Sequence, residues 1–325
     1  MFAPVARPLR FLAAVSAAVL VSGLASGCGA LADEANGSSG GDREVVAAFY
    51  PLAWVTEQVA GDDWTVTNLT TPGGEPHDLE LGISQTSDLA AASLVVYLGG
   101  FQPSVDAAVD SNAEGATLDA ADAVTLEPVA DHSEEGHDEE SHADDEGGDE
   151  HDHGDVDPHF WIDPLKMAEL GDGVAEQLAE LDPDHAAAYR ANAEELASQL
   201  DDLDAAYAQG LAGCERDLVV VSHDAFGYLA RYGLHLEPIN GLSPDAEPNP
   251  ATLAELADVI EDEGVTTVFS ERLASPALAE TLATDLGVET GVLDPIEGLP
   301  DETSGDDYLS LMQGNLAALQ EANGC

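Results

Sequence analysis

Basic residues are scarce in this chain, which has eight lysine and arginine residues against 65 aspartate and glutamate residues. The formal net charge at pH 7 is −57. A protein that binds nucleic acid needs a basic surface to neutralise phosphate groups, so this composition argues against a nucleic-acid partner. Cations are the partners that such acidity favours. For most of the charge, a solvated acidic surface is the interpretation that we favour, and only the segment over 131–157 suggests more.

Cysteine is also rare, with three in 325 residues. Cys28 follows two arginines, an apolar run over residues 11–24 and three small residues, an order typical of a secretory signal. The apolar run is shorter than the roughly 20 residues that a transmembrane helix needs. The site around Cys28 resembles a bacterial lipobox, which implies a signal peptide over 1–27 and a lipid anchor at Cys28 on the outer face of the cell membrane. A plain secretory signal is the alternative.

The other two cysteines are Cys214 and the last residue, Cys325. In a chain exported from the cytoplasm, two remaining cysteines most simply pair. We therefore predict a Cys214–Cys325 disulfide bond.

Common catalytic motifs are missing from the sequence. It contains no phosphate-cradling P-loop and no HExxH helix, and its one GxSxG match, GSSGG at 37–41, lies in a Gly- and Ser-rich segment and not in a strand-to-helix elbow. These absences argue against ATP hydrolysis by this chain and against the enzyme classes that use the other two motifs.

Segments typical of strands and helices alternate along the chain, which predicts an α/β fold with largely parallel sheets. Residues 184–209 have helical periodicity without glycine or internal proline, and they predict one long rigid helix between two α/β halves. Ligands of such sheets bind beyond the carboxyl ends of the strands. The expected organisation is a flexible tether over 28–43, an N-terminal lobe over 44–183, a connecting helix over 184–210 and a C-terminal lobe over 211–325.

An acidic segment over 131–157 interrupts the first half. It holds fourteen acidic residues and five histidines with almost no apolar side chains, so we expect a solvated loop. Its histidines can bind metal weakly and collect it near a tighter site, although an acidic solubilising linker is the simpler alternative. The five are His132, His137, His142, His151 and His153.

Three further histidines follow predicted strand ends or turns: His77, His159 and His223. Imidazole nitrogens are good ligands for zinc, and three of them with one carboxylate make a tetrahedral site. Each histidine alone is weak evidence, because a histidine at the start of a helix is more often a cap or a surface group. His185 and His235 are interpreted as structural.

The segments around the three histidines are GEPHDLELG at 74–82, DPHFWIDP at 157–164 and SHDAFGYLARYGL at 222–234. Together they closely resemble the histidine motifs of the zinc-binding, substrate-binding lipoproteins of bacterial ABC transporters. The resemblance covers the chain from Glu44 onward. It implies two α/β lobes bridged by a rigid helix, with His77, His159 and His223 around one Zn²⁺ in the cleft. The resemblance also implies a function: the protein, as a monomer, passes zinc to a membrane permease. The ATPase of that permease is a separate chain.

The resemblance leaves the fourth ligand open, because family members use a carboxylate of the second lobe or a water. Glu297 is favoured for its longer side chain after a predicted strand, and Asp294 and Glu271 are the alternatives. Three nitrogen ligands favour zinc over manganese, which harder oxygen ligands suit better, although ligand affinity alone would also favour copper. A manganese- or iron-binding protein of the same fold is the alternative. A zinc-dependent hydrolase is the competing hypothesis, and the sequence neither supports nor excludes a role in cell adhesion.

Overall fold

The computed structural model describes residues 43–129, 156–244, 246, 248, 250–300 and 305–325. The predicted signal peptide, Cys28 and nearly all of the tether lie outside the described residues. So do the five histidines of the acidic segment.

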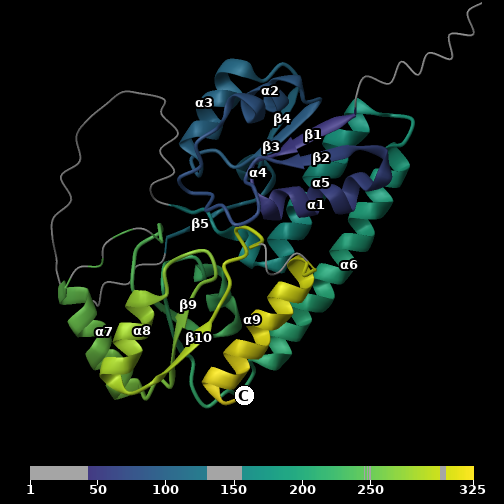
Figure 1. The fold of residues 1–325 in the computed structure, drawn as a ribbon. Coiled ribbons are helices and arrows are strands. Elements are labelled where there is room, and N and C mark those ends of the chain that lie inside the picture. Colours follow the sequence, from purple (N-terminus) through teal and green to yellow (C-terminus); the bar gives the residue numbers. More distant parts are fainter. Residues whose placement is uncertain (1–42, 130–155, 245, 247, 249, 301–304) are drawn as a thin grey trace, which may run out of the picture. The chain divides into compact units, whose positions relative to one another are not determined.

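The first half contains a four-stranded parallel sheet in the order β2-β1-β3-β4. Its strands are β1 (Glu44–Ala47), β2 (Thr65–Asn68), β3 (Leu94–Tyr97) and β4 (Ala116–Asp119). Helices α1 (Tyr50–Ala60) and α5 (Pro164–Leu181) cover one face, and α2 (Ile83–Ala91) and α3 (Pro103–Asn112) cover the other (Figure 1). The short elements η1 (Gly61–Asp63) and α4 (Ala120–Ala123) complete this half.

The second half repeats this topology in another parallel sheet, whose order is β8-β7-β9-β10. Its strands are β7 (Leu218–Val221), β8 (His235–Pro238), β9 (Thr267–Ser270) and β10 (Glu289–Val292). Its helices are η3 (Gly227–Tyr232), α7 (Pro250–Glu263), α8 (Ala277–Leu286) and α9 (Tyr308–Asn323). In both sheets the second and third strands along the chain pair with opposite edges of the first, so the direction of the strand order reverses at the first strand. Ligands of α/β proteins bind at such a topological switch point. The predicted α/β fold class is confirmed.

The long helix expected between the halves is α6 (Ala186–Gly210), which has 25 residues and is about 38 Å long at 1.5 Å per residue. It packs against α1 and α5 from the first half and against α9 from the second (Figure 1). One buried hydrophobic cluster contains residues of both halves, including Val46, Trp161, Val219 and Tyr308. The boundaries of the two lobes stay a prediction.

Local sequence explains how several elements begin. Asp163 caps α5 by accepting a hydrogen bond from the backbone N–H of Leu165, and Pro164 takes the first helical position, where its missing N–H costs nothing. Asp307 and Ser310 form a reciprocal capping box at the start of α9. The described helices include none that is long and apolar enough to cross a membrane.

The sequence pattern of residues 223–232 predicts a helix directly after β7, and the structure differs from that prediction. His223 lies in a bend, and the regular structure within 223–232 is the 3-10 helix η3, which begins at Gly227. The backbone N–H of Asp224 donates to the carbonyl of Gly241, so a neighbouring loop holds the chain here. Strand β4, the short helix α4 and the two-residue strands β5 (Glu127–Pro128) and β6 (Val156–Asp157) were also not predicted.

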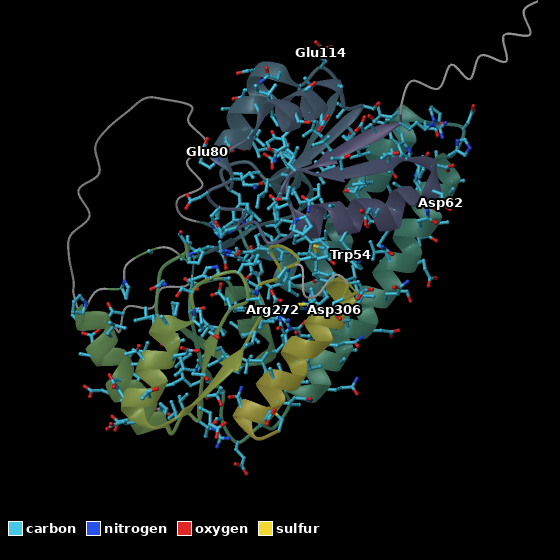
Figure 2. The ribbon with its side chains drawn as sticks, viewed as in Figure 1. Trp54, Asp62, Glu80, Glu114, Arg272 and Asp306 are labelled. Atoms are coloured by element: carbon cyan, nitrogen blue, oxygen red, sulfur yellow. A yellow bond between two sulfur atoms is a disulfide. The ribbon has the colours of Figure 1, made fainter. Side chains whose placement is uncertain are left out.

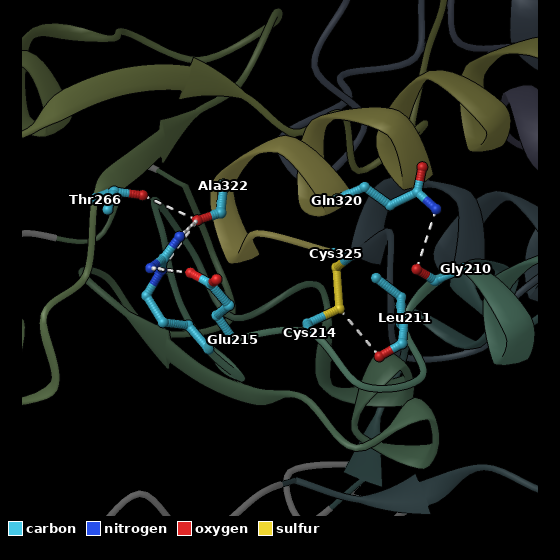
Figure 3. Close-up of a disulfide and its surroundings, with 9 residues drawn as sticks. Gly210, Leu211, Cys214, Glu215, Thr266, Gln320, Ala322 and Cys325 are labelled. Carbon is cyan, nitrogen blue, oxygen red and sulfur yellow. Dashed lines mark hydrogen bonds and ion pairs between the residues drawn. A yellow bond between two sulfur atoms is a disulfide. The ribbon is translucent and has the colours of Figure 1, made fainter.

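A disulfide bond joins Cys214 and Cys325, 111 positions apart, as the sequence predicts (Figure 3). It ties the end of the chain, just after α9, to the connection between α6 and β7. Beside it, the Ala322 carbonyl accepts hydrogen bonds from Arg216 and Thr266, which satisfies the end of α9 (Figure 3).

Candidate metal centre

The structure brings together four side chains that lie far apart in the sequence. His77 is in the loop after β2, His159 lies between β6 and the 3-10 helix η2 (Phe160–Ile162), His223 follows β7 and Glu297 follows β10. One potential ligand atom from each residue lies within 4.8 Å of the others. Three of these segments begin at carboxyl ends of parallel strands, where α/β sheets place their ligands.

Glu297 is the common neighbour of the three imidazoles. Its Oε1 atom lies 3.2 Å from His77 Nε2, 3.5 Å from His159 Nε2 and 3.3 Å from His223 Nε2. Ligands about 2.0–2.1 Å from a tetrahedral Zn²⁺ are separated from each other by roughly 3.4 Å. The three distances from Glu297 therefore match the edges of a zinc-ligand tetrahedron.

The centre is closed off from water on most sides. The side chains of His159 and His223 are fully buried, and that of Glu297 is 2% exposed. Apart from the contacts with Glu297 Oε1 at 3.3–3.5 Å, which are not hydrogen bonds, the buried Nε2 atoms of both histidines have no polar partner in the described part of the chain. Because buried nitrogen atoms are almost always paired, these two are atoms that a bound ion would satisfy.

Two buried carboxylates orient the rings of His159 and His223 by contacting Nδ1, the ring nitrogen that faces away from the centre. His159 Nδ1 lies 2.8 Å from Asp157 Oδ1, and His223 Nδ1 lies 2.6 Å from Glu271 Oε1, which also accepts a hydrogen bond from the Ser222 hydroxyl. A carboxylate on Nδ1 favours the tautomer that carries a proton there and leaves the lone pair of Nε2 free. Both rings are therefore presented as metal ligands.

His77 is placed differently, by an aromatic contact and by its loop. Its ring centroid lies 4.6 Å from that of Phe101 at an interplanar angle of 64°, and its side chain is 12% exposed. Glu75, two residues earlier, has its Oε1 atom 4.0 Å from His77 Nε2. His77 thus forms the side of the centre nearest to solvent.

The loop that carries Glu297 is fixed by a set of buried hydrogen bonds. Ile296 has a φ angle of 59°, a left-handed conformation that costs a β-branched residue about 1–3 kcal/mol. The backbone N–H of Ile296 donates to Asp294 Oδ1, and the side-chain amide of Asn315 in α9 bonds both the N–H and the carbonyl of Asp294. Trp161 Nε1 donates to the Pro295 carbonyl over 2.7 Å. These contacts hold the strained turn that aims Glu297 at the histidines.

Electrostatics at the centre follow from burial and from these contacts. Burial raises the pKa of Glu297, but its bonds with His159, His223 and His77 outweigh burial and hold that pKa well below the usual range. Burial lowers the pKa of His223, yet its bonds with Glu271 and Glu297 raise it to about 10. His159 shows the same balance: burial lowers its pKa, and Asp157 and Glu297 raise it above the ordinary value. Without metal, His159 and His223 therefore favour their protonated forms beside an ionised Glu297.

The two alternative fourth ligands have other partners. Glu271 contacts His223 from the side opposite the cluster, and Asp294 pairs with Arg272, whose Nε lies 3.0 Å from Asp294 Oδ2. Arg272 is marked in Figure 2. Burial raises the pKa of Asp294 to about 6. Of the three acidic candidates, Glu297 is the one whose carboxylate lies among the imidazoles.

The remaining histidines of the described chain lie outside the cluster. His185 precedes α6 with its Nδ1 2.8 Å from Asp182 Oδ2, and His235 is exposed on β8. Sequence reasoning missed the roles of Asp157 and Asn315. Asp157 could have been found, because it stands two residues before His159 in the quoted motif, whereas nothing near Asn315 points to Asp294.

Comparison with known proteins shows the family to which the chain belongs. Residues 45–322 match the family described as zinc-uptake complex component A, periplasmic (ZnuA). The chain is 34% identical over 306 residues to the high-affinity zinc uptake system protein ZnuA of Bacillus subtilis (strain 168), with 92% of this chain and 93% of that protein covered.

Two further relatives extend the comparison. The zinc-binding lipoprotein AdcA of Streptococcus pneumoniae (strain ATCC BAA-255 / R6) is 36% identical over 285 residues; the match covers 86% of this chain, which thus spans 56% of the length of AdcA. The solved structure of the laminin binding protein Lmb of Streptococcus agalactiae, described as a bifunctional protein with adhesin and metal transporting activity, superposes with a TM-score of 0.74. It is 27% identical, and the match covers 86% of this chain and 99% of that one. The chain described here belongs to the ZnuA family of periplasmic zinc-uptake complex components.

Proposed function

We propose that this protein binds Zn²⁺ tightly outside the cytoplasm and delivers it to a membrane permease for uptake. His77, His159 and His223 bind the ion through Nε2, and Glu297 supplies the fourth ligand. The observation that carries the proposal is the position of Glu297 Oε1, 3.2–3.5 Å from all three Nε2 atoms.

Ligand chemistry supports zinc as the ion. Three nitrogen atoms and one oxygen atom suit Zn²⁺ in tetrahedral geometry, whereas manganese prefers more oxygen ligands. The charge of the surroundings supports a divalent cation. Three carboxylates are either a ligand (Glu297) or in contact with a ligand histidine (Asp157 and Glu271), and their side chains are 2%, 5% and 3% exposed. Burying these charges without a cation is costly.

A binding role is favoured over the competing hydrolase. A catalytic zinc site keeps an open position for water, which the metal activates as a nucleophile. Here Glu297 occupies the fourth corner of the tetrahedron, and the centre is buried. The relatives named above are described by binding and transport, not by catalysis.

Delivery completes the proposal. Lipid attachment at Cys28 keeps the protein on the outer face of the membrane, where it acts as a monomer beside a permease whose ATPase is a separate chain. The lobes over 44–183 and 211–325 contribute ligands from both sides, and the helix over 184–210 keeps their spacing. The histidines of the acidic segment collect zinc near the centre. Removing 131–155 will reduce the number of weakly bound ions, measured by calorimetry, and leave the tight site intact.

A metal-binding measurement with a matched control tests the proposal. The chain without its signal peptide is purified without chelator, its metal content is measured, and zinc and manganese are titrated in competition. We expect one tight zinc ion per chain and a preference for zinc. His159→Ala will weaken zinc binding severely, while His235→Ala, which removes an exposed histidine outside the centre, will not.

The rival hypotheses predict different results. Tighter binding of manganese than zinc would favour a manganese-binding member of this fold. Zinc-dependent hydrolysis that disappears in His159→Ala would instead establish the enzyme. Zinc uptake by cells that produce the wild-type chain or His159→Ala tests delivery, and equal uptake would contradict a role in transport.

A further inference from the structure

The four residues of the metal centre differ in their access to solvent. The side chains of His159 and His223 are 0% exposed and that of Glu297 is 2% exposed, whereas the side chain of His77 is 12% exposed. An ion that enters or leaves therefore passes on the His77 side. Along this path it must exchange water for protein ligands one at a time, because a bare divalent cation is far too costly in a buried site.

Glu75 stands on that side. Its side chain is 23% exposed, so it reaches from the solvent boundary inward, and its Oε1 atom lies 4.0 Å from His77 Nε2. That oxygen is itself buried and has no hydrogen-bond partner among the residues described. The other oxygen, Oε2, accepts a hydrogen bond of 3.2 Å from the backbone N–H of Asp78. One oxygen is thus used to fix the carboxylate, and the other is left unpaired beside a metal ligand.

The loop that carries Glu75 is held against the loop that carries Glu297. The backbone N–H of Gly73 donates to the Leu299 carbonyl over 2.9 Å. A Cβ atom on Gly298 would lie 3.3 Å from the Gly74 carbonyl oxygen, which shows how closely the two loops approach. Glu75 therefore keeps a defined position relative to the centre.

We propose that Glu75 is a transfer ligand, a carboxylate that binds Zn²⁺ transiently while the ion moves between solvent and the four residues of the centre. This inference rests on the proposed function and adds a residue outside the resting site. Four ligands complete tetrahedral zinc, so the bound ion does not need Glu75, but zinc expands to five ligands readily during exchange. Glu75 supplies the fifth ligand before the last water leaves, and again when the first imidazole is released.

The proposal has a kinetic signature. A ligand that contacts the ion only in transit lowers the barrier equally in both directions, so its loss slows association and dissociation together and leaves the equilibrium constant unchanged. A resident ligand would change the dissociation constant. A charge that acts only through its long-range field would alter association in a salt-dependent way.

The test compares Glu75→Gln with Glu80→Gln in the chain without its signal peptide. Both changes remove one negative charge from the same loop region, and Glu80 is exposed (Figure 2). Metal-free protein is mixed rapidly with Zn²⁺ to measure association, and zinc-loaded protein is mixed with a chromophoric chelator to measure dissociation. We expect Glu75→Gln to slow both steps about tenfold with a Kd within about twofold of wild type, and Glu80→Gln to change neither rate. A tenfold change corresponds to about 1.4 kcal/mol in each barrier.

A second variant separates contact from charge. Glu75→Asp keeps the charge but withdraws the oxygen by one methylene group, so a transfer ligand predicts that it also slows both steps. Unfolding temperatures near that of wild type show that the variants fold. Equal rates in Glu75→Gln and wild type, equal effects in Glu80→Gln, wild-type rates in Glu75→Asp, or faster dissociation alone would each overturn the proposal. Failure of wild-type protein to bind zinc would instead overturn the proposed function.

Discussion

Replacing Asp157 with asparagine tests how much the centre depends on residues behind the ligands. Asp157 Oδ1 lies 2.8 Å from His159 Nδ1 and 2.9 Å from the backbone nitrogen of His159, and the residue is 3% exposed. Asparagine keeps the shape and one acceptor oxygen but loses the charge. Hydrogen bonds to charged groups contribute about 1.5–3 kcal/mol and neutral ones about 0.5–1.5 kcal/mol, so the change weakens this pair by about 1–1.5 kcal/mol.

Metal binding should show this loss directly, because the carboxylate raises the basicity of His159 toward the ion. About 1.4 kcal/mol is a factor of ten in Kd, which agrees with the 10–100-fold effects of changes behind metal ligands. We expect zinc affinity, measured by competition with a chromophoric chelator, to fall about tenfold in Asp157→Asn. Asp62→Asn removes the same charge from an exposed position (Figure 2) and should have almost no effect. Unchanged affinity in Asp157→Asn, or an equal loss in Asp62→Asn, would refute the reasoning.

Three further predictions concern the disulfide, the Glu297 loop and pH. Replacing Cys214 and Cys325 with serine should reduce the free energy of unfolding by about 5 kcal/mol, measured by denaturant titration, because the bond closes a loop of about 110 residues. Zinc affinity should stay within about twofold, and a large loss would show that the bond acts on the centre. Asn315→Ala removes both hydrogen bonds to the backbone of Asp294, so zinc affinity should fall severalfold and amide exchange at Ile296 should quicken; unchanged exchange would contradict the role given to Asn315. In the metal-free protein the pKa of His223 is about 10, so zinc must displace a proton from this ring when it binds. Zinc affinity should therefore rise with pH below that value. Calorimetry in buffers of different ionisation enthalpy should detect the released proton. Equal heats in all buffers would contradict this.

The sequence predicts the fold well where local signals are strong. The β-branched strands β1 and β7, the Asp163–Pro164 start of α5 and the uninterrupted helix α6 each carry a signal that needs no distant partner. The segment after His223 was predicted wrongly because the Gly241 carbonyl, 17 positions away, takes the hydrogen bond of Asp224 and overrides local helical spacing.

For the metal centre, too, residues with a local sequence signal could be predicted and residues that depend on distant contacts could not. The three histidines could be predicted because each stands in a recognisable segment at the end of a strand or turn, and the quoted motifs resemble one family. Asn315 and the left-handed Ile296 could not, because their roles depend on which loop meets α9 in three dimensions. Among the three acidic candidates, side-chain length favoured Glu297, and the structure places it alone among the imidazoles, with Glu271 behind His223.

The central claim is that one zinc ion binds between these four side chains. Anomalous diffraction at the zinc edge from crystals of the zinc-loaded chain locates the ion without reference to any prior interpretation. We expect one strong peak about 2.0–2.2 Å from Nε2 of His77, His159 and His223 and from a carboxylate oxygen of Glu297. A strong peak elsewhere, with these four residues still contacting one another directly, would contradict it.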